Sequence, residues 1–100
     1  MVVGSGPGGG YDVFSRMIAP YFSKVIGTTV VVENRPGAGG NTGSDAVAKS
    51  PPDGYNMVIA TIGPIAINPS LYSKMPYDPV KDLAPVTFSG EVPNGLVVHP

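Results

Sequence analysis

The sequence of 100 residues contains no cysteine, a single histidine and few charged residues, which make up 13% of the chain. Without cysteine the protein has no disulfide, no thiolate metal site and no cysteine nucleophile. His99 has no partner at catalytic or metal-binding spacing, and neither a Ser/His/Asp triad nor a pair of catalytic carboxylates can be assembled from the remaining residues. The residues therefore indicate no catalytic centre.

Basic residues and long apolar runs are also scarce. The six Lys and Arg residues are scattered, and the net charge is −1, so the basic face that nucleic acid requires is missing. No apolar run reaches the roughly 20 residues that cross a bilayer, and no charged-then-apolar leader precedes the first strand-like residues. Strand-like patterns lie at both ends of the chain, and we therefore expect it to be a fragment.

Glycine and proline are abundant, at 14 and 12 residues, and they separate apolar runs instead of forming a low-complexity tract. This distribution predicts one small ordered domain with tight connections. The most informative connection follows Val2 and Val3, where five glycines occur within residues 4–10. A helical pattern follows them. A glycine-rich strand-to-helix turn lets an anion approach free backbone N–H groups at the positive end of the helix.

A helix is predicted after this turn by apolar residues spaced at three and four positions, with Gly27 as its end. Asp12, in the first turn, suits the helix dipole and can reach back to a free N–H. Pro20 should bend the helix. The apolar residues expected to face the core are Phe14, Met17, Ile18, Tyr21, Phe22 and Val25, and the opposite face carries Asp12, Ser15, Arg16, Ala19, Ser23 and Lys24.

Two further strands are predicted, at residues 28–33 and 55–61, the first of them buried on both faces. Between them lies a second glycine-rich turn, residues 34–40, and a short helix capped by Asn41 or Thr42. Short joints between alternating strands and helices predict a parallel α/β sheet with right-handed crossovers. Ligands of such sheets bind at the carboxyl ends of the strands, here the turns at 4–12, 34–42 and 61–64.

The last third of the chain is less regular. Residues 65–71 are expected to form helical turns broken by Pro69, and Asp78 should cap a turn that Pro79 begins. Two more strands are predicted, at residues 86–89 and 95–99.

One interpretation of the first glycine turn is dinucleotide binding. Gly4-x-Gly6-x-x-Gly9 lies between a strand and a helix, and Glu33 ends the next strand at the spacing that suits a ribose hydroxyl. This alternative makes the chain an FAD- or NAD-binding domain of an oxidoreductase.

A second interpretation rests on several blocks of sequence in order. These blocks resemble the extracytoplasmic solute receptors of the tripartite tricarboxylate transporter family, also called Bug receptors. The resemblance covers nearly the whole chain, so it is more specific than the glycine fingerprint. The blocks are residues 7–12, 30–41, 52–55, 68–72, 75–86 and 92–94.

The resemblance implies the parallel-sheet, three-layer lobe of a type II periplasmic binding protein, without enzymatic activity or cofactor. Residues 1–100 would be part of the N-terminal lobe, without the signal peptide and the second lobe. The implied location is the periplasm. The implied partners are a small carboxylate (a di- or tricarboxylate, an amino acid or an aromatic acid) and the membrane permease subunits. Exposed surface that would face the missing lobe also suggests self-association.

The resemblance places the first ligand-binding loop at Gly8, Gly9 and Gly10, whose N–H groups would hold the carboxylate. Tyr11 departs from the small hydroxyl residue expected there and should narrow the pocket. Asp12 is either a helix cap or a ligand for an amino group, and the cap is favoured because a carboxylate beside a bound carboxylate would repel it.

The second candidate loop comprises Gly39, Gly40, Asn41 and Thr42, which either contact the ligand or only cap the short helix. Thr61 is a candidate hydroxyl donor at the end of the third strand. Arg35, next to Glu33 along the strand end, is either a surface ion-pair partner or a bidentate clamp for a carboxylate.

Overall fold

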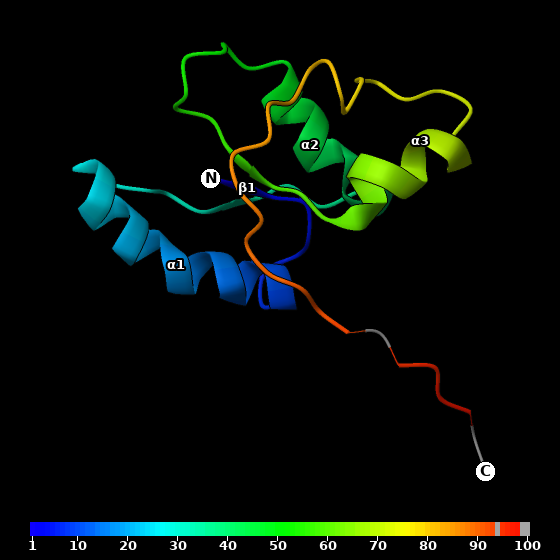
Figure 1. Cartoon of the computed structure of the whole chain (residues 1–100), viewed down its shortest axis with the longest axis horizontal. Helices are drawn as coiled ribbons and strands as arrows, with labels where there is room; N and C mark the ends of the chain where they lie inside the picture. Colours follow the sequence, from blue (N-terminus) through cyan, green and yellow to red (C-terminus); the bar gives the residue numbers. More distant parts are fainter. Residues whose placement is uncertain (94, 99–100) are drawn as a thin grey trace.

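A computed structural model describes residues 1–93 and 95–98 of the chain (Figure 1). Three short strands alternate with two main helices, and two further helical segments follow the last strand. The elements are β1 (Val2–Val3), α1 (Gly10–Ile26), β2 (Glu33–Asn34), η1 (Ala38–Gly40), α2 (Asn41–Ala48), β3 (Val58–Ile59), η2 (Gly63–Ile67) and α3 (Asn68–Leu71).

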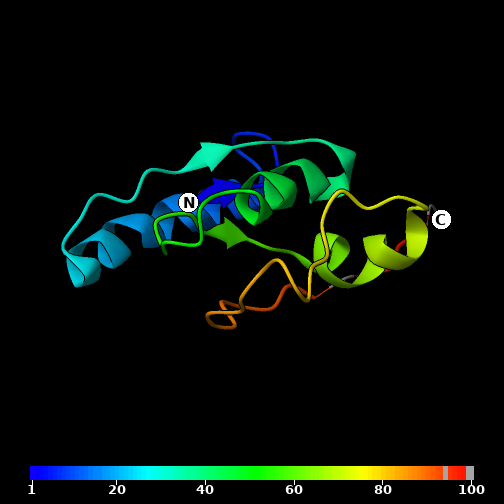
Figure 2. The ribbon, with the colours of Figure 1, turned by 90° about the horizontal axis from the view of Figure 1, so that it is seen from above.

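The three strands form one parallel sheet in the order β2-β1-β3. Val2 pairs with Glu33 on one side and with Val58 on the other. The chain passes from β1 through α1 to β2, then through α2 to β3 on the far side of β1. Helices α1 and α2 consequently lie on opposite faces of the sheet, which makes three layers (Figures 1 and 2). The predicted parallel α/β arrangement is confirmed.

The strands are shorter than predicted. Only Glu33–Asn34 and Val58–Ile59 pair with β1, because β1 itself offers two residues to each neighbour. The prediction that residues 28–33 are buried on both faces is wrong. β2 is an edge strand, and Val31, just before it, is 69% exposed.

Helix α1 ends as predicted, with Gly27 in the left-handed conformation (φ 72°) and its N–H donating to the Ser23 carbonyl oxygen. The helix continues through Pro20. The prediction of its buried face is wrong in part, because Phe14, Ile18 and Phe22 are half-buried but the most buried residues lie on the face expected to be polar. Its buried residues are Asp12, Ser15 and Ala19, whereas Tyr21 is 76% exposed.

The reason for this reversal is the close approach of α1 to the sheet. Short side chains lie beneath the helix, where a large side chain would hold the two layers apart. The apolar arc is rotated away from the sheet, and in the described part of the chain Met17, Tyr21 and Val25 remain exposed. Val2, Val3 and Ala19 form the apolar centre of the fold.

Helix α2 packs against the end of β1 through glycine. A Cβ on Gly43 would lie 3.0 Å from the Gly4 Cα and 3.2 Å from the Arg35 carbonyl oxygen. The helix starts with Gly40 as its N-cap and has no side-chain cap. The prediction that Asn41 or Thr42 caps it is therefore wrong.

Residues 63–71 form the helical turns η2 and α3 without interruption. Pro69 does not break them, because it lies in the first turn of α3, where an N–H needs no intrahelical acceptor. The predicted cap at Asp78 is confirmed, since its Oδ1 accepts hydrogen bonds from the N–H groups of Val80 and Lys81.

The predicted strands near the carboxyl end are not observed. Residues 86–89 and 95–98 contain no strand, and His99 lies outside the described residues. None of the helices in the described ranges has the length and apolar character needed to cross a membrane.

The glycine contact between α2 and β1 predicts that Gly43→Ala destabilises the fold. The added methyl group would overlap backbone atoms, which cannot move as a side chain can, and overpacking of this kind costs about 1–3 kcal/mol. Urea denaturation would measure the free energy of unfolding. Gly90→Ala is the matched control, because a Cβ there meets nothing within 4 Å. A Gly43→Ala variant as stable as Gly90→Ala would contradict the packing described.

Candidate ligand-binding site

A cavity of about 290 Å³ lies at the carboxyl ends of β1 and β3. Its walls come from the loops that follow the three strands and from the starts of α1, α2 and η2. The lining residues are Gly4, Ser5, Tyr11, Gly37, Gly39, Gly40, Ser44, Ile59, Thr61 and Pro64.

The topology explains the position of the cavity. The connection after β1 leads to one face of the sheet and towards β2, whereas β3 lies on the other side of β1. The strand order therefore reverses between β1 and β3. A crevice opens at the carboxyl ends of these two strands, as in other open α/β sheets. The predicted location at the carboxyl ends of the strands agrees with this cavity.

The structure brings four of the ten candidate residues into the cavity wall, namely Tyr11, Gly39, Gly40 and Thr61. The other six do not line it. They lie beside it, in the turn before α1 and at the start of α2, and are Gly8, Gly9, Gly10, Asp12, Asn41 and Thr42.

Two of the three candidate glycine amides of the first loop are engaged within the chain. The Gly8 N–H donates to Asp12 Oδ2 at 2.8 Å, and the Gly9 N–H donates to the Gly6 carbonyl oxygen at 3.3 Å. Gly10 and Tyr11 are the first two residues of α1, and the N–H groups at such positions have no acceptor within the helix. The free amides at this turn are therefore those of Gly10 and Tyr11, and those of Gly8 and Gly9 are occupied.

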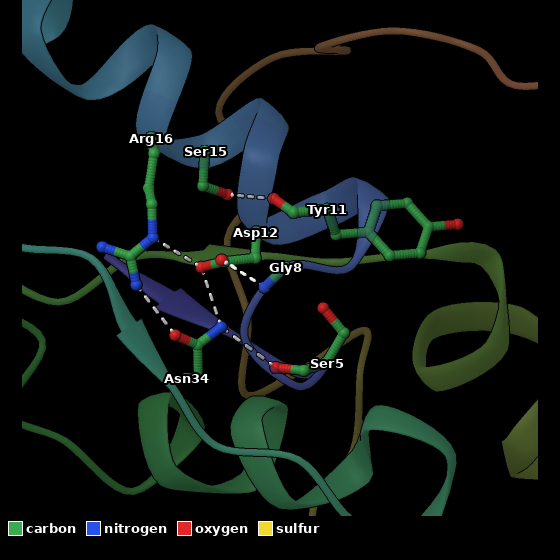
Figure 3. A network of polar contacts seen from close by, with 7 residues as sticks. All are labelled: Ser5, Gly8, Tyr11, Asp12, Ser15, Arg16 and Asn34. Carbon is green, nitrogen blue, oxygen red and sulfur yellow. Dashed lines mark hydrogen bonds and ion pairs between the residues drawn. The ribbon is translucent and has the colours of Figure 1, made fainter.

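Asp12 fixes this loop. Its side chain is 5% exposed, and its Oδ1 accepts hydrogen bonds from Asn34 Nδ2 and Arg16 Nε, both at 2.9 Å (Figure 3). Asn34 Nδ2 also donates to the Ser5 carbonyl oxygen at 3.1 Å, and Arg16 Nη2 donates to Asn34 Oδ1 at 3.0 Å. The network joins the first loop, α1 and β2, and the reach of Asp12 back to a free N–H is as predicted.

These donors lower the pKa of Asp12 from 3.8 to about 2. The hydrogen bond from the Gly8 N–H is the largest cause, followed by those from Asn34 and Arg16, all of which favour the ionised carboxylate. Asp12 therefore carries its negative charge throughout the physiological range.

The second loop is held in a conformation that favours glycine. Gly37, Gly39 and Gly40 have φ values of 134°, 63° and 93°, and Ala38 between them has φ 47°. A Cβ on Gly40 would lie 2.8 Å from Pro64 Cγ, so the loop packs directly on η2. This contact closes the side of the cavity opposite α1.

Asn41 does not cap α2, and its side chain is engaged by residues further along the chain. Its buried side chain accepts a hydrogen bond from Asn68 Nδ2 at 2.8 Å and donates to Met75 Sδ at 3.5 Å. The Tyr77 hydroxyl lies 3.3 Å from the same Asn41 oxygen and donates to the Pro64 carbonyl oxygen at 2.9 Å. Burial raises the pKa of Tyr77. Asn41 therefore fastens residues 64–77 to α2, behind the cavity.

Sequence reasoning missed Ser5 and Ser44, two hydroxyl residues of the cavity wall. The Ser5 Oγ is buried and has no hydrogen-bond partner within the described residues. Its position directly after β1 was the available signal, since that is where a parallel sheet presents ligand contacts. Nothing in the sequence indicated that the apolar residues Ile59 and Pro64 would line the cavity.

The lining residues of the cavity offer only neutral hydrogen-bonding groups, because none of them is charged. Arg35 does not line it and instead pairs with Glu33 at 2.8 Å on the surface. Over residues 1–93 and 95–98 there is no group of His, Cys, Asp or Glu residues that could hold a metal ion. The arrangement suits hydrogen bonding to a small polar ligand.

The three-layer fold and this cavity define an α/β lobe of the solute-binding type. The comparisons with known proteins are more specific. Residues 14–100 match the family described as "Tripartite tricarboxylate transporter family receptor". The chain belongs to this receptor family, which confirms the resemblance and the fold class predicted from the sequence.

The relatives include protein BugT of Bordetella pertussis, 44% identical over the whole chain, and a UPF0065 protein of Pseudomonas sp., 41% identical over 92% of the chain. Among solved structures, a periplasmic transporter superposes on 80% of the chain with a TM-score of 0.76 and 41% identity. R. palustris Rpa4515 with adipate superposes on 79% with a TM-score of 0.71 and 39% identity.

The chain spans less than a third of these proteins. It covers 31% of BugT, 27% of the Pseudomonas protein and 27% of each solved structure.

The Asp12 network predicts a loss of stability in acid. The pKa of Asp12 is about 2 in the folded protein and near 3.8 without the network, so the unfolded chain binds the proton more readily. The stabilisation is complete above pH about 4 and is lost as the pH falls towards about 2. Carboxyl ¹³C NMR of Asp12 should give a midpoint near 2, and Asn34→Ala should raise it. A titration midpoint near 3.8 that does not change in the Asn34→Ala variant would contradict the network.

Proposed function

We propose that this chain is the ligand-binding part of a receptor that captures a small carboxylate for a tripartite tricarboxylate-type uptake system. The observation that carries the proposal is the cavity at the switch point of the sheet, in a chain that belongs to the receptor family. The structural neighbour with adipate supports a carboxylate as the ligand, since adipate is a dicarboxylate.

The carboxylate is held by backbone N–H groups at the start of α1, with hydroxyl groups of the cavity wall as further donors. Gly10 and Tyr11 supply free amides where the helix dipole is positive. Thr61 lies across the cavity at the end of the third strand. Hydrogen bonds to a charged group contribute about 1.5–3 kcal/mol each, so a few such donors suffice for a small acid.

Asp12 favours this ligand over a dinucleotide. A pyrophosphate at the start of α1 would bring two negative charges close to a carboxylate that stays ionised. The Gly8 amide, which a pyrophosphate would need, already donates to Asp12. Purified protein without visible flavin absorption and without a thermal shift on adding NAD would agree with the carboxylate proposal. A flavin spectrum would end it.

The proposed location is the periplasm, and the proposed partners are the membrane permease subunits of the uptake system. Both follow from the family and from the structural neighbour described as a periplasmic transporter. In the intact receptor, closure of a second lobe over the cavity would exclude water and strengthen the hydrogen bonds. The chain alone provides one side of the pocket, so its affinity should be weak.

Thr61→Val tests the role of the cavity wall. The substitution keeps the shape of the side chain and removes a hydroxyl, so acetate binding should weaken about 3- to 10-fold. Titration of ¹⁵N-labelled protein with acetate, followed by amide NMR, measures the dissociation constant even when binding is weak. The amides of Gly10 and Tyr11 should shift most.

Thr28→Val is the matched control, because Thr28 is exposed and does not line the cavity. Equal weakening in both variants would count against a contact by Thr61. Shifts confined to residues far from the cavity would count against the site itself.

We also propose that the isolated chain self-associates through the apolar arc of α1, where Met17 is 64% and Val25 83% exposed. Exposed apolar surface of this kind favours association. Sedimentation velocity should show a mass that rises with concentration, and Tyr21→Lys should reduce the association. A monomer at all concentrations would refute it.

A further inference from the structure

The cavity wall gives information about the body of the ligand beyond its carboxylate. We infer that this wall selects a carboxylate whose remaining part is uncharged and flat, and that the ring of Tyr11 is the selecting surface. The inference rests on the proposed function, because it assumes that the carboxylate group binds at the start of α1.

The first argument is the balance of charge. None of the six Lys and Arg residues lines the cavity, and four of them are paired with carboxylates. These ion pairs are Arg16–Asp12, Arg35–Glu33, Lys49–Asp45 and Lys81–Asp78. The cavity offers hydrogen-bond donors and the starts of α1 and α2, whose dipoles are each equivalent to about half a positive charge. That is enough for one carboxylate and leaves a second or third without a counter-charge in this wall.

Asp12 strengthens this argument. Its carboxylate is ionised and follows Tyr11 directly at the start of α1. Arg16 pairs with it, but the Arg16 side chain is half exposed, so solvent screens the compensation. Each additional negative charge on the ligand would be repelled by Asp12.

The second argument is the shape and chemistry of the wall. Tyr11 lines the cavity and is 42% exposed, so its ring is available to a ligand. Figure 3 shows its side chain pointing away from the Asp12–Asn34 network, and Ser5 lines the same cavity. Ile59 and Pro64 are the other apolar lining residues. A planar ligand can stack on a tyrosine ring, with apolar contacts on its other side.

Ser5 is a further polar residue of the cavity wall. Its Oγ is buried and has no partner in the described part of the chain, although hydroxyl groups in such positions are nearly always hydrogen-bonded. The unsatisfied hydroxyl belongs to a residue of the cavity wall. A small rotation of the side chain would offer it to an oxygen atom of the ligand.

The test compares four acids on the same protein by amide NMR titration. Acetate probes the carboxylate alone, benzoate adds a flat uncharged ring, cyclohexanecarboxylate adds a ring that is not flat, and citrate adds further charges. Benzoate should bind about 3- to 10-fold more tightly than cyclohexanecarboxylate, because only the flat ring can stack on Tyr11. Citrate should bind more weakly than benzoate.

Two variants identify the selecting surface. Tyr11→Thr should lower the ratio of benzoate affinity to acetate affinity about 3- to 10-fold, with both acids measured on the same variant, whereas Tyr11→Phe should keep this ratio. The amide spectra of both variants verify that they are folded. A Tyr11→Phe variant that loses benzoate as Tyr11→Thr does would assign the effect to the hydroxyl group and overturn stacking.

The results also separate the two proposals. If none of the four acids shifts the amides at the start of α1, the proposed function fails, and this inference fails with it. If acetate binds there but citrate binds at least as tightly as benzoate, the proposed function stands and the inference alone is overturned.

Discussion

The Asp12 carboxylate is the group on which the geometry of the first loop depends. Three donors from three parts of the chain, the Gly8 amide, Asn34 and Arg16, converge on its two oxygens. They hold the loop after β1 against β2 and define which amides are occupied. Because Gly8 is already engaged, a ligand at this corner must use the N–H groups that α1 itself leaves free. The same side chain thus shapes the site and adds a fixed negative charge to it.

A second constraint is the approach of backbone to backbone where β1 ends. Gly4, Gly40 and Gly43 lie so close that a Cβ on any of them would meet a backbone atom or Pro64 at 3.0 Å or less. This packing brings the loops after β1 and β2 together with η2 and leaves a cavity between them. Glycine is needed at these positions because the backbones approach each other closely, as well as for unusual φ values. A sheet of two-residue strands can therefore still position a defined site.

The sequence predicted the order of elements well, because strand and helix periodicity and the Gly27 and Asp78 signals are local. It did not predict which side of α1 faces the sheet. Periodicity identifies the apolar arc, but the small residues Ser15 and Ala19 occupy the contact, and a hydrophobic pattern cannot show how closely two layers approach. Nor did it predict that Asn41 would turn away from the loop. Its partners, Asn68 and Tyr77, lie 27 and 36 residues further along the chain, and such contacts exist only in the folded protein.

For the site, the sequence indicated the edge of the sheet at which the cavity lies, and the family match covers most of the chain. The chemistry of the wall depends on where the charged residues go. In the fold Arg35 pairs with Glu33 at the surface and Lys49 pairs with Asp45 on α2, so neither is available to the cavity. The groups that this wall presents are amides, hydroxyl groups and the ring of Tyr11. Neutral donors bind an anion well only when water is excluded, since the local dielectric then strengthens each hydrogen bond. We therefore expect an open cavity formed by this chain alone to bind weakly, and a second surface that closes over it to increase affinity without contributing any positive charge.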